Sequence, residues 1–217
     1  VERIGKAYGT YMRRSGHETV SVGRDVRLTS RRIRDDLVRG ILSTGLNIID
    51  VGEVPTPLVY FSIVHFNTHG SVMVTGSHNP IEFNGLKMNE GILSLYGDAI
   101  SGLYDIAESG DFEEGAGTLE KKDITAPYRQ MLLERINPER SFTIVIDAGN
   151  ATAGPIAPEV FEKMGCRVIR LYCEPDGSFP NHLPDPTVLK YTEDLRRTVV
   201  EEKADLGFGY DGDSDRV

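Results

Sequence analysis

The sequence contains only two cysteines, Cys166 and Cys173, and they lie outside any Cys-x-x-Cys frame. This scarcity argues against a disulfide framework or a cysteine-rich zinc site, and it favours reduced thiols. Long apolar runs are lacking as well, since none reaches the roughly 18 residues that a membrane-spanning helix needs. We therefore expect a cytoplasmic protein that has no membrane partner.

Positive charge is also in short supply. The chain has 24 lysines and arginines against 33 aspartates and glutamates, which gives a formal net charge of −9. This balance argues against a nucleic-acid-binding surface, although a local group of cations can still attract a small anionic substrate. The first residues lack the basic start and apolar core of a signal peptide. They also lack a methionine, so we expect the natural start to lie upstream.

The first half of the chain alternates short apolar runs with helical patterns in the order β-α-β-α-β, which favours a largely parallel sheet. Strands are expected over residues 20–23, 47–51, 71–74 and 86–88, and helices over 30–42, 57–66 and 96–107. Residues 109–123 are polar and contain three glycines, which is typical of a linker.

After this stretch the same pattern begins again. Helices are expected over residues 125–136, up to 165 and over 188–202, and strands over 142–146, 167–171 and 205–209. We therefore predict an α/β protein of two three-layer α/β/α domains, residues 1–122 and 123–217, with mixed, largely parallel sheets. Ligands of such sheets gather beyond the carboxyl ends of the strands.

Two loops at predicted strand ends carry the candidate chemistry. Residues 75–80, Thr-Gly-Ser-His-Asn-Pro, present a hydroxyl on a glycine-containing loop. An ordinary turn has the same composition, and the pattern is not the G-x-S-x-G of an α/β-hydrolase. Lys87 lies in an apolar stretch ten residues after Ser77, where a surface lysine is the simpler alternative.

The second loop is residues 211–216, Asp-Gly-Asp-Ser-Asp-Arg. Three carboxylates at alternate positions can converge on one hard cation, although a solvated acidic turn has the same composition. The loop matches neither an EF-hand nor the D-x-D-x-T motif of haloacid-dehalogenase-type phosphatases. A hydroxyl, a divalent metal and an arginine together are the groups that phosphoryl transfer requires.

Together the two loops resemble those of the α-D-phosphohexomutase superfamily, most closely its bacterial phosphomannomutase/phosphoglucomutase branch. The resemblance extends over nearly the whole chain. It includes residues 22–27, 50–57, 84–87, 147–150, 171–177 and 179–182.

The resemblance implies an enzyme whose Ser77 carries a phosphoryl group. It implies that Mg²⁺ is bound by Asp211, Asp213 and Asp215 together with an oxygen on Ser77. It further implies that Lys87 assists proton transfer, that His78 flanks the serine and that Arg216 supports the phosphate or sugar. The implied reaction moves a phosphoryl group between positions 1 and 6 of a mannose or glucose phosphate. A hexose 1,6-bisphosphate is its intermediate and activator.

This sequence departs from the family pattern in its length and at two residues. Members usually have four domains, and neither the sugar-binding loop of the third nor the phosphate-binding loop of the fourth is found. We therefore expect the first two domains of a longer polypeptide, poorly active without the missing C-terminal domains.

Ser214 and Ala151 stand where the family commonly has glycine, and a left-handed backbone would strain either residue. Two other functions remain open: a phosphatase or phosphotransferase acting on sugar phosphates, and a non-catalytic Mg²⁺-dependent binding module. Glucosamine phosphate also remains open as the substrate.

Overall fold

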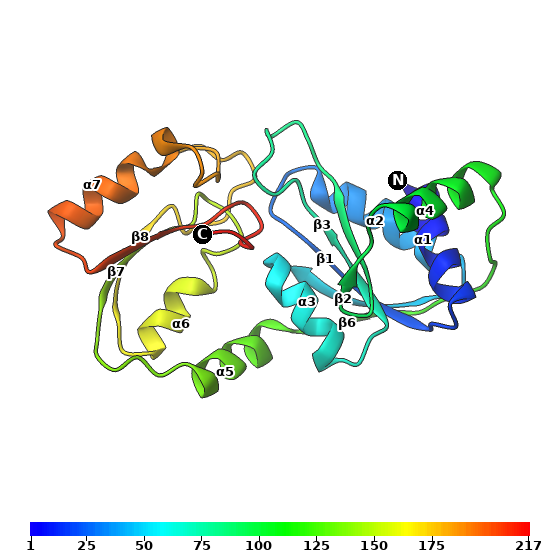
Figure 1. The fold of residues 1–217 in the computed structure, drawn as a ribbon, viewed down its shortest axis with the longest axis horizontal. Helices are drawn as coiled ribbons and strands as arrows, with labels where there is room; N and C mark the ends of the chain where they lie inside the picture. The colour runs from blue at the N-terminus through cyan, green and yellow to red at the C-terminus, as the bar shows by residue number, and fades with distance from the viewer.

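The computed structural model describes residues 1–217 and contains two α/β units arranged along its long axis (Figure 1). One unit has a six-stranded mixed sheet, and the other has a three-stranded sheet that is entirely parallel. The predicted fold class is therefore confirmed. None of the helices combines the length and the apolarity that a membrane crossing demands.

The larger sheet has the strand order β5-β4-β3-β1-β2-β6. The pairs β3–β4 and β4–β5 are antiparallel, and the other three pairs are parallel. The strands are β1 (Thr19–Arg24), β2 (Asn47–Glu53), β3 (Gly70–Val74), β4 (Leu86–Glu90), β5 (Leu93–Ser94) and β6 (Leu119–Lys121). Because side chains alternate along a strand, neighbouring Ile48 and Ile49 of β2 enter separate hydrophobic clusters.

Helices cover both faces of this sheet. The cluster that contains Ile48 packs under α1 (Glu2–Arg14) and α2 (Ser30–Leu42). The helix α4 (Asp98–Ser109) lies against α1. The cluster that contains Ile49 packs under α3 (Thr56–His65). The helix α5 (Thr125–Arg135) then contacts α3 of the first unit and α6 (Ala157–Lys163) of the second.

The smaller sheet has the order β8-β7-β9, with β7 (Thr143–Asp147), β8 (Arg167–Leu171) and β9 (Leu206–Gly209). Its faces are covered by α6 and by α7 (Glu193–Glu201). Phe208 stacks on Phe161 of α6, with ring centroids 5.5 Å apart. Its neighbour Gly207 faces α7, where a Cβ atom would lie 2.6 Å from Val199.

Two expectations about secondary structure were wrong, and one helix was not predicted. Residues 119–121 of the expected linker form β6, and residues 189–192 form a 3-10 turn (η1) before α7 instead of its first turn. No element was predicted over residues 2–14, where the structure has α1; Gly5 and Gly9 lower the helix propensity of this segment. These glycines let α1 approach its neighbours closely, since a Cβ atom on Gly5 would lie 2.3 Å from the carbonyl oxygen of Leu37. The division at residue 122 stays a prediction.

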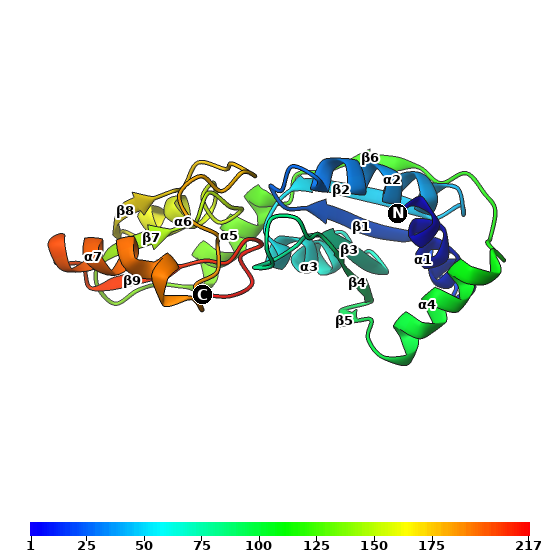
Figure 2. The same cartoon turned by 90° about the horizontal axis from the view of Figure 1, so that it is seen from above.

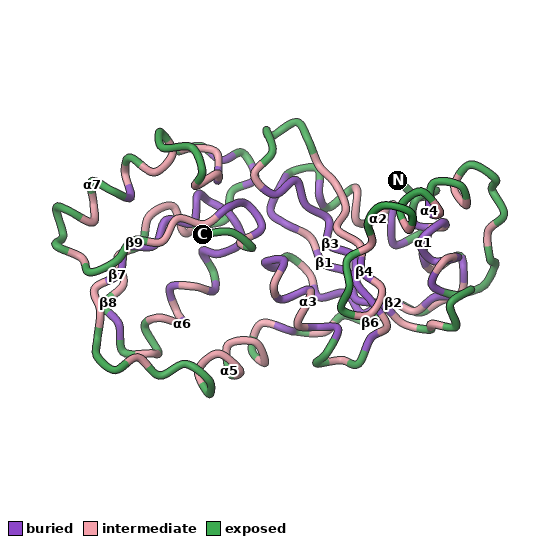
Figure 3. Tube along the Cα trace, viewed as in Figure 1, coloured by how far each residue is buried: buried purple, intermediate pink, exposed green.

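The carboxyl ends of the two sheets face each other. The loop that follows β3 meets the loop that follows β9 between the two units, as the view from above shows (Figure 2). Buried backbone segments of both units gather at this junction (Figure 3). The fold therefore brings together the two loops on which the functional hypothesis rests.

Candidate functional site

The serine loop, residues 75–80, is shaped by the buried carboxylate of Asp25. Asp25 Oδ2 accepts hydrogen bonds from the Thr75 hydroxyl at 2.8 Å and the Gly76 N–H at 3.2 Å. Burial raises the pKa of Asp25, while hydrogen bonds from Ser30 and Thr75 act in the opposite direction. The hydroxyl of Ser30, the first residue of α2, also donates to Asp25. The loop holds Ser77 at φ 50°.

Arg27 fastens the rest of the loop. Its side chain is 2% exposed, and its guanidinium donates to the carbonyl oxygens of four loop residues. The acceptors and N···O distances are Ser77 at 2.9 Å, Asn79 at 2.6 Å, Pro80 at 2.8 Å and Phe83 at 3.0 Å. A Cβ atom on Gly76 would lie 2.5 Å from the guanidinium carbon, so only glycine fits over this arginine.

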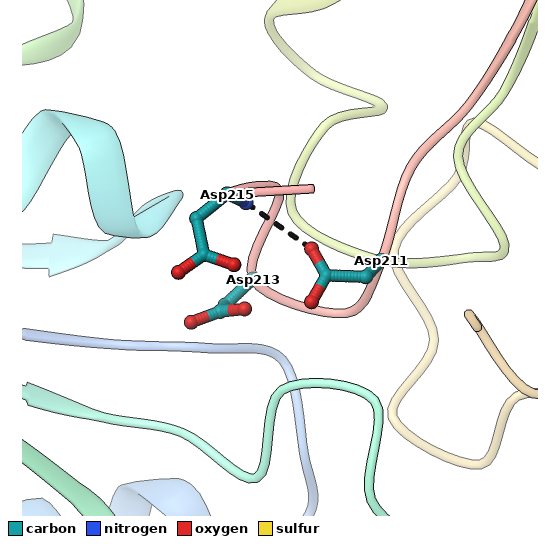
Figure 4. Close-up of side chains that lie close together, drawn as sticks. All are labelled: Asp211, Asp213 and Asp215. Atoms are coloured by element: carbon teal, nitrogen blue, oxygen red, sulfur yellow. Dashed lines mark hydrogen bonds between the residues drawn. The ribbon is translucent and has the colours of Figure 1, made fainter. Parts of the chain in front are cut away.

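The carboxylate loop, residues 211–216, turns around Asp211. Asp211 Oδ1 accepts the N–H groups of Asp215 at 3.1 Å and Arg216 at 3.2 Å. One carboxylate oxygen from each of Asp211, Asp213 and Asp215 lies within 4.8 Å of the other two (Figure 4). Asp211 and Asp213 are buried and Asp215 is exposed, so the cluster opens to solvent on one side.

Side chains of the first unit reach into this cluster. The Ser77 hydroxyl donates to Asp211 Oδ2 at 2.7 Å. The ammonium of Lys87, on β4, donates at 2.6 Å to one oxygen of Asp213 and one of Asp215. Thr56, the first residue of α3, donates its hydroxyl to Asp213 Oδ2 at 2.5 Å and its N–H to the Asp213 carbonyl at 2.8 Å. The site is therefore formed across both units.

The charges of the cluster depend on one another. Burial and the neighbouring Asp213 raise the pKa of Asp211 to about 6. Burial also acts to raise the pKa of Asp213, but hydrogen bonds from Lys87 and Thr56 outweigh it and the pKa is lowered. Burial acts to lower the pKa of Lys87, but its hydrogen bonds to two carboxylates leave that pKa raised. Lys87 is therefore a stable cation.

The donor set fits a hard divalent cation. Carboxylate oxygens are the ligands that Mg²⁺ prefers, and opposite ligands of an octahedral Mg²⁺ lie about 4.2 Å apart. The oxygens of the three aspartates lie within 4.8 Å of one another, which is near that spacing. Asp213 Oδ1 is buried and has no hydrogen-bond partner, which is costly for a carboxylate unless a cation satisfies it.

His78 and Arg216 lie at the rim. Arg216 Nη1 donates to His78 Nδ1 at 2.6 Å. His78 Nδ1 is also 3.4 Å from Ser77 Oγ. Every residue predicted for the site thus lies in one continuous cluster. The chemical roles of these residues stay predictions.

Sequence reasoning missed the residues that hold the two loops in place. Asp25 and Arg27 lie within residues 22–27 and Thr56 within 50–57, which the family resemblance includes without giving them a role. Their function follows from contacts between distant segments, so the one usable signal was the presence of polar residues next to buried strands.

The two departures from glycine behave differently. Ser214 does adopt a left-handed backbone, at φ 61°. Ala151 has no positive φ, and its buried side chain packs with Val26 and Phe179. The expected strain therefore concerns Ser214 alone.

Comparisons with known proteins agree with this geometry. Residues 1–114 match the family model for the phosphoglucomutase/phosphomannomutase α/β/α domain I, and residues 124–217 match that for domain II. The chain is 41% identical over 214 residues to a phosphomannomutase/phosphoglucomutase of Pseudomonas aeruginosa, covering 99% of this chain and 46% of that protein. It is 38% identical over 216 residues to a phosphoglucomutase of Neisseria meningitidis, with coverage of 99% and 47%.

A crystal structure of a phosphoglucomutase/phosphomannomutase family protein from Burkholderia thailandensis superposes with a TM-score of 0.94 at 36% identity. The superposition covers 98% of this chain and 48% of that one. The chain thus spans about half the length of the relatives it matches.

Proposed function

Because this chain belongs to the phosphoglucomutase/phosphomannomutase family, we propose that it supplies the phosphoryl-carrying half of a phosphohexomutase site. The observation that carries the proposal is the 2.7 Å contact between Ser77 Oγ and Asp211, within a carboxylate cluster that has an unpaired buried oxygen. The proposed substrates are hexose 1- and 6-phosphates, with mannose or glucose as the sugar.

In the proposed cycle Ser77 begins as a phosphoserine. A free hydroxyl of the hexose phosphate attacks the phosphorus, and the bond from phosphorus to Ser77 Oγ breaks. The hydroxyl proton is passed to Ser77 Oγ, which leaves a hexose 1,6-bisphosphate and a neutral serine. After the sugar turns over, Ser77 Oγ attacks the other phosphate, and the sugar oxygen that leaves takes the proton.

The chain's own residues prepare this exchange. The serine loop presents Ser77 on a rigid turn, because Asp25 and Arg27 hold its backbone from beneath. Lys87 is a cation bonded to Asp213 and Asp215, and in the proposed cycle it offsets developing negative charge and assists proton transfer. The guanidinium of Arg216 lies at the open rim beside His78, where an incoming phosphate or sugar would pass.

Asp211, Asp213 and Asp215 would hold Mg²⁺. The ion would withdraw charge from the phosphoryl oxygens when bound. Thr56 and Lys87 both donate to Asp213 Oδ2 and so orient this carboxylate, which leaves Oδ1 for the ion.

The test is turnover in a polypeptide that continues this chain to the length of its relatives. Conversion of glucose 1-phosphate to glucose 6-phosphate, followed by a coupled assay, should disappear in Ser77→Ala. Lys87→Ala should slow conversion by roughly 10²–10⁴ while Mg²⁺ still binds. Near-normal turnover by Ser77→Ala would end the phosphoserine mechanism, and release of inorganic phosphate in place of isomerisation would indicate a phosphatase.

A further inference from the structure

The carboxylate loop contains a residue in an unfavourable backbone conformation. Ser214 lies between two proposed metal ligands, Asp213 and Asp215, at φ 61°. A left-handed conformation is unfavourable for a residue with a Cβ atom and costs glycine almost nothing. Within the loop the Ser214 N–H donates to the Asp211 carbonyl at 3.1 Å, and the Ser214 side chain is supported from outside the loop.

The nearest support is the hydroxyl of Thr152, in the loop between β7 and α6. Thr152 is 3% exposed, and its Oγ1 atom lies 2.9 Å from Ser214 Oγ and 3.2 Å from the carbonyl oxygen of Gly212. A carbonyl oxygen can only accept, so the single hydroxyl proton of Thr152 goes to Gly212. Ser214 must then donate to Thr152, which fixes the direction of both hydrogen bonds.

This chain of hydroxyls contacts the carboxylate loop on both sides of Asp213. Thr152 contacts the carbonyl of Gly212, which precedes Asp213, and the side chain of Ser214, which follows Asp213. The backbone of Gly212 also has no room to shift, because a Cβ atom there would lie 2.4 Å from the Ser77 carbonyl oxygen. A change at Thr152 should therefore alter where Asp213 and Asp215 point.

We infer that Thr152 is a positioning residue for the metal site: its hydroxyl holds Ser214 in the left-handed conformation that lets Asp213 and Asp215 face the same ion. The inference rests on the proposed function, because it assumes that the three carboxylates bind Mg²⁺. It does not require Thr152 to touch the metal, the phosphoryl group or the sugar.

The experiment is a double-mutant cycle read by the Mg²⁺ dissociation constant, measured by calorimetry on the 217-residue chain. Thr152→Val keeps the shape of the side chain and removes the hydroxyl, and it should raise the Kd roughly 3- to 10-fold. Thr152→Ser keeps the hydroxyl and should bind Mg²⁺ nearly as well as the parent chain. Thr152→Val should raise the Kd much less in a Ser214→Gly background, because glycine needs no support at positive φ.

Thr44→Val is the matched control. Thr44 is 1% exposed, and its hydroxyl donates to the carbonyl of Ile41 in the first unit, away from the carboxylate loop. This variant should lose stability but keep the Mg²⁺ Kd, which separates positioning from general destabilisation. Thermal unfolding without metal identifies any variant that fails to fold, and in that case Thr152→Ser and Ser214→Gly still test the pair.

An unchanged Kd in Thr152→Val would overturn the inference. So would the same fold-change for Thr152→Val in the Ser and Gly backgrounds at position 214. A parent chain that does not bind Mg²⁺ would instead overturn the proposed function, so the two failures can be told apart.

Discussion

The serine loop and the carboxylate loop are held in different ways. The serine loop is fixed within its own unit, because Asp25 and Arg27 bind its backbone from beneath. The carboxylate loop takes much of its support from the other unit, through Ser77, Thr56 and Lys87. The difference teaches that the serine is held by contacts within one unit, whereas the three carboxylates are held by contacts from both units.

The largest effect should come from removing the support of the serine loop. Arg27→Met leaves the buried Asp25 without its cation and several loop carbonyls without a donor, so we expect unfolding to become easier by about 3–5 kcal/mol. Urea unfolding measures this loss. Arg31→Met replaces an exposed arginine in the first turn of α2, and it should change stability by less than about 0.5 kcal/mol. A loss in Arg27→Met of only about 1 kcal/mol would show that the loop holds itself.

A smaller effect should follow from cutting one connection between the units. Thr56→Val removes a hydroxyl that donates to a buried carboxylate, and such hydrogen bonds contribute roughly 1.5–3 kcal/mol. We expect weaker Mg²⁺ binding as well, although Thr56 lies outside the carboxylate loop. Ser62→Ala on the same helix removes a hydroxyl that bonds only to Val59, and it should leave Mg²⁺ binding unchanged. Equal Mg²⁺ affinity in both variants would mean that the second unit alone arranges its ligands.

The smallest effect should be a pH dependence confined to the second unit. His182 Nε2 lies 3.0 Å from Asp147 Oδ2, in a loop rich in proline. Burial acts to lower the pKa of His182, but its bonds to Asp147 and the Leu183 carbonyl outweigh this, and the pKa is raised. A raised histidine pKa gives stability that is complete below the unfolded value, near 6.5, and is lost as pH rises through the folded value.

We therefore expect the free energy of unfolding of the parent chain, measured with urea, to fall between pH 6 and pH 8.5 by an amount on the order of 1 kcal/mol or less. The part of the fall due to this pair should be absent in His182→Gln. The same pH dependence in both proteins would contradict the assignment of charge to this histidine.

The sequence predicted most of the elements and the residues that the two loops bring together, but not what holds the loops. Strand ends could be located because apolar runs stop at Val74 and Gly209, where polar loops begin. The supporting roles of Arg27 and Thr152 could not be predicted, since each acts on residues more than 50 positions away. The helix α1 was not predicted either: its glycines lower helix propensity, and their close approach to Leu37 and Thr44 is visible only in the structure.

Phosphorylation of Ser77 tests most directly whether the two loops form one phosphoryl-transfer site. The chain would be incubated with glucose 1,6-bisphosphate, with and without Mg²⁺, and the intact mass and the Ser77 peptide would then be examined. The account predicts a phosphate-sized mass increase on Ser77 that requires Mg²⁺ and is absent in both Ser77→Ala and Asp213→Asn. Phosphate on another residue, or equal labelling of Ser77 without the metal and in Asp213→Asn, would contradict it.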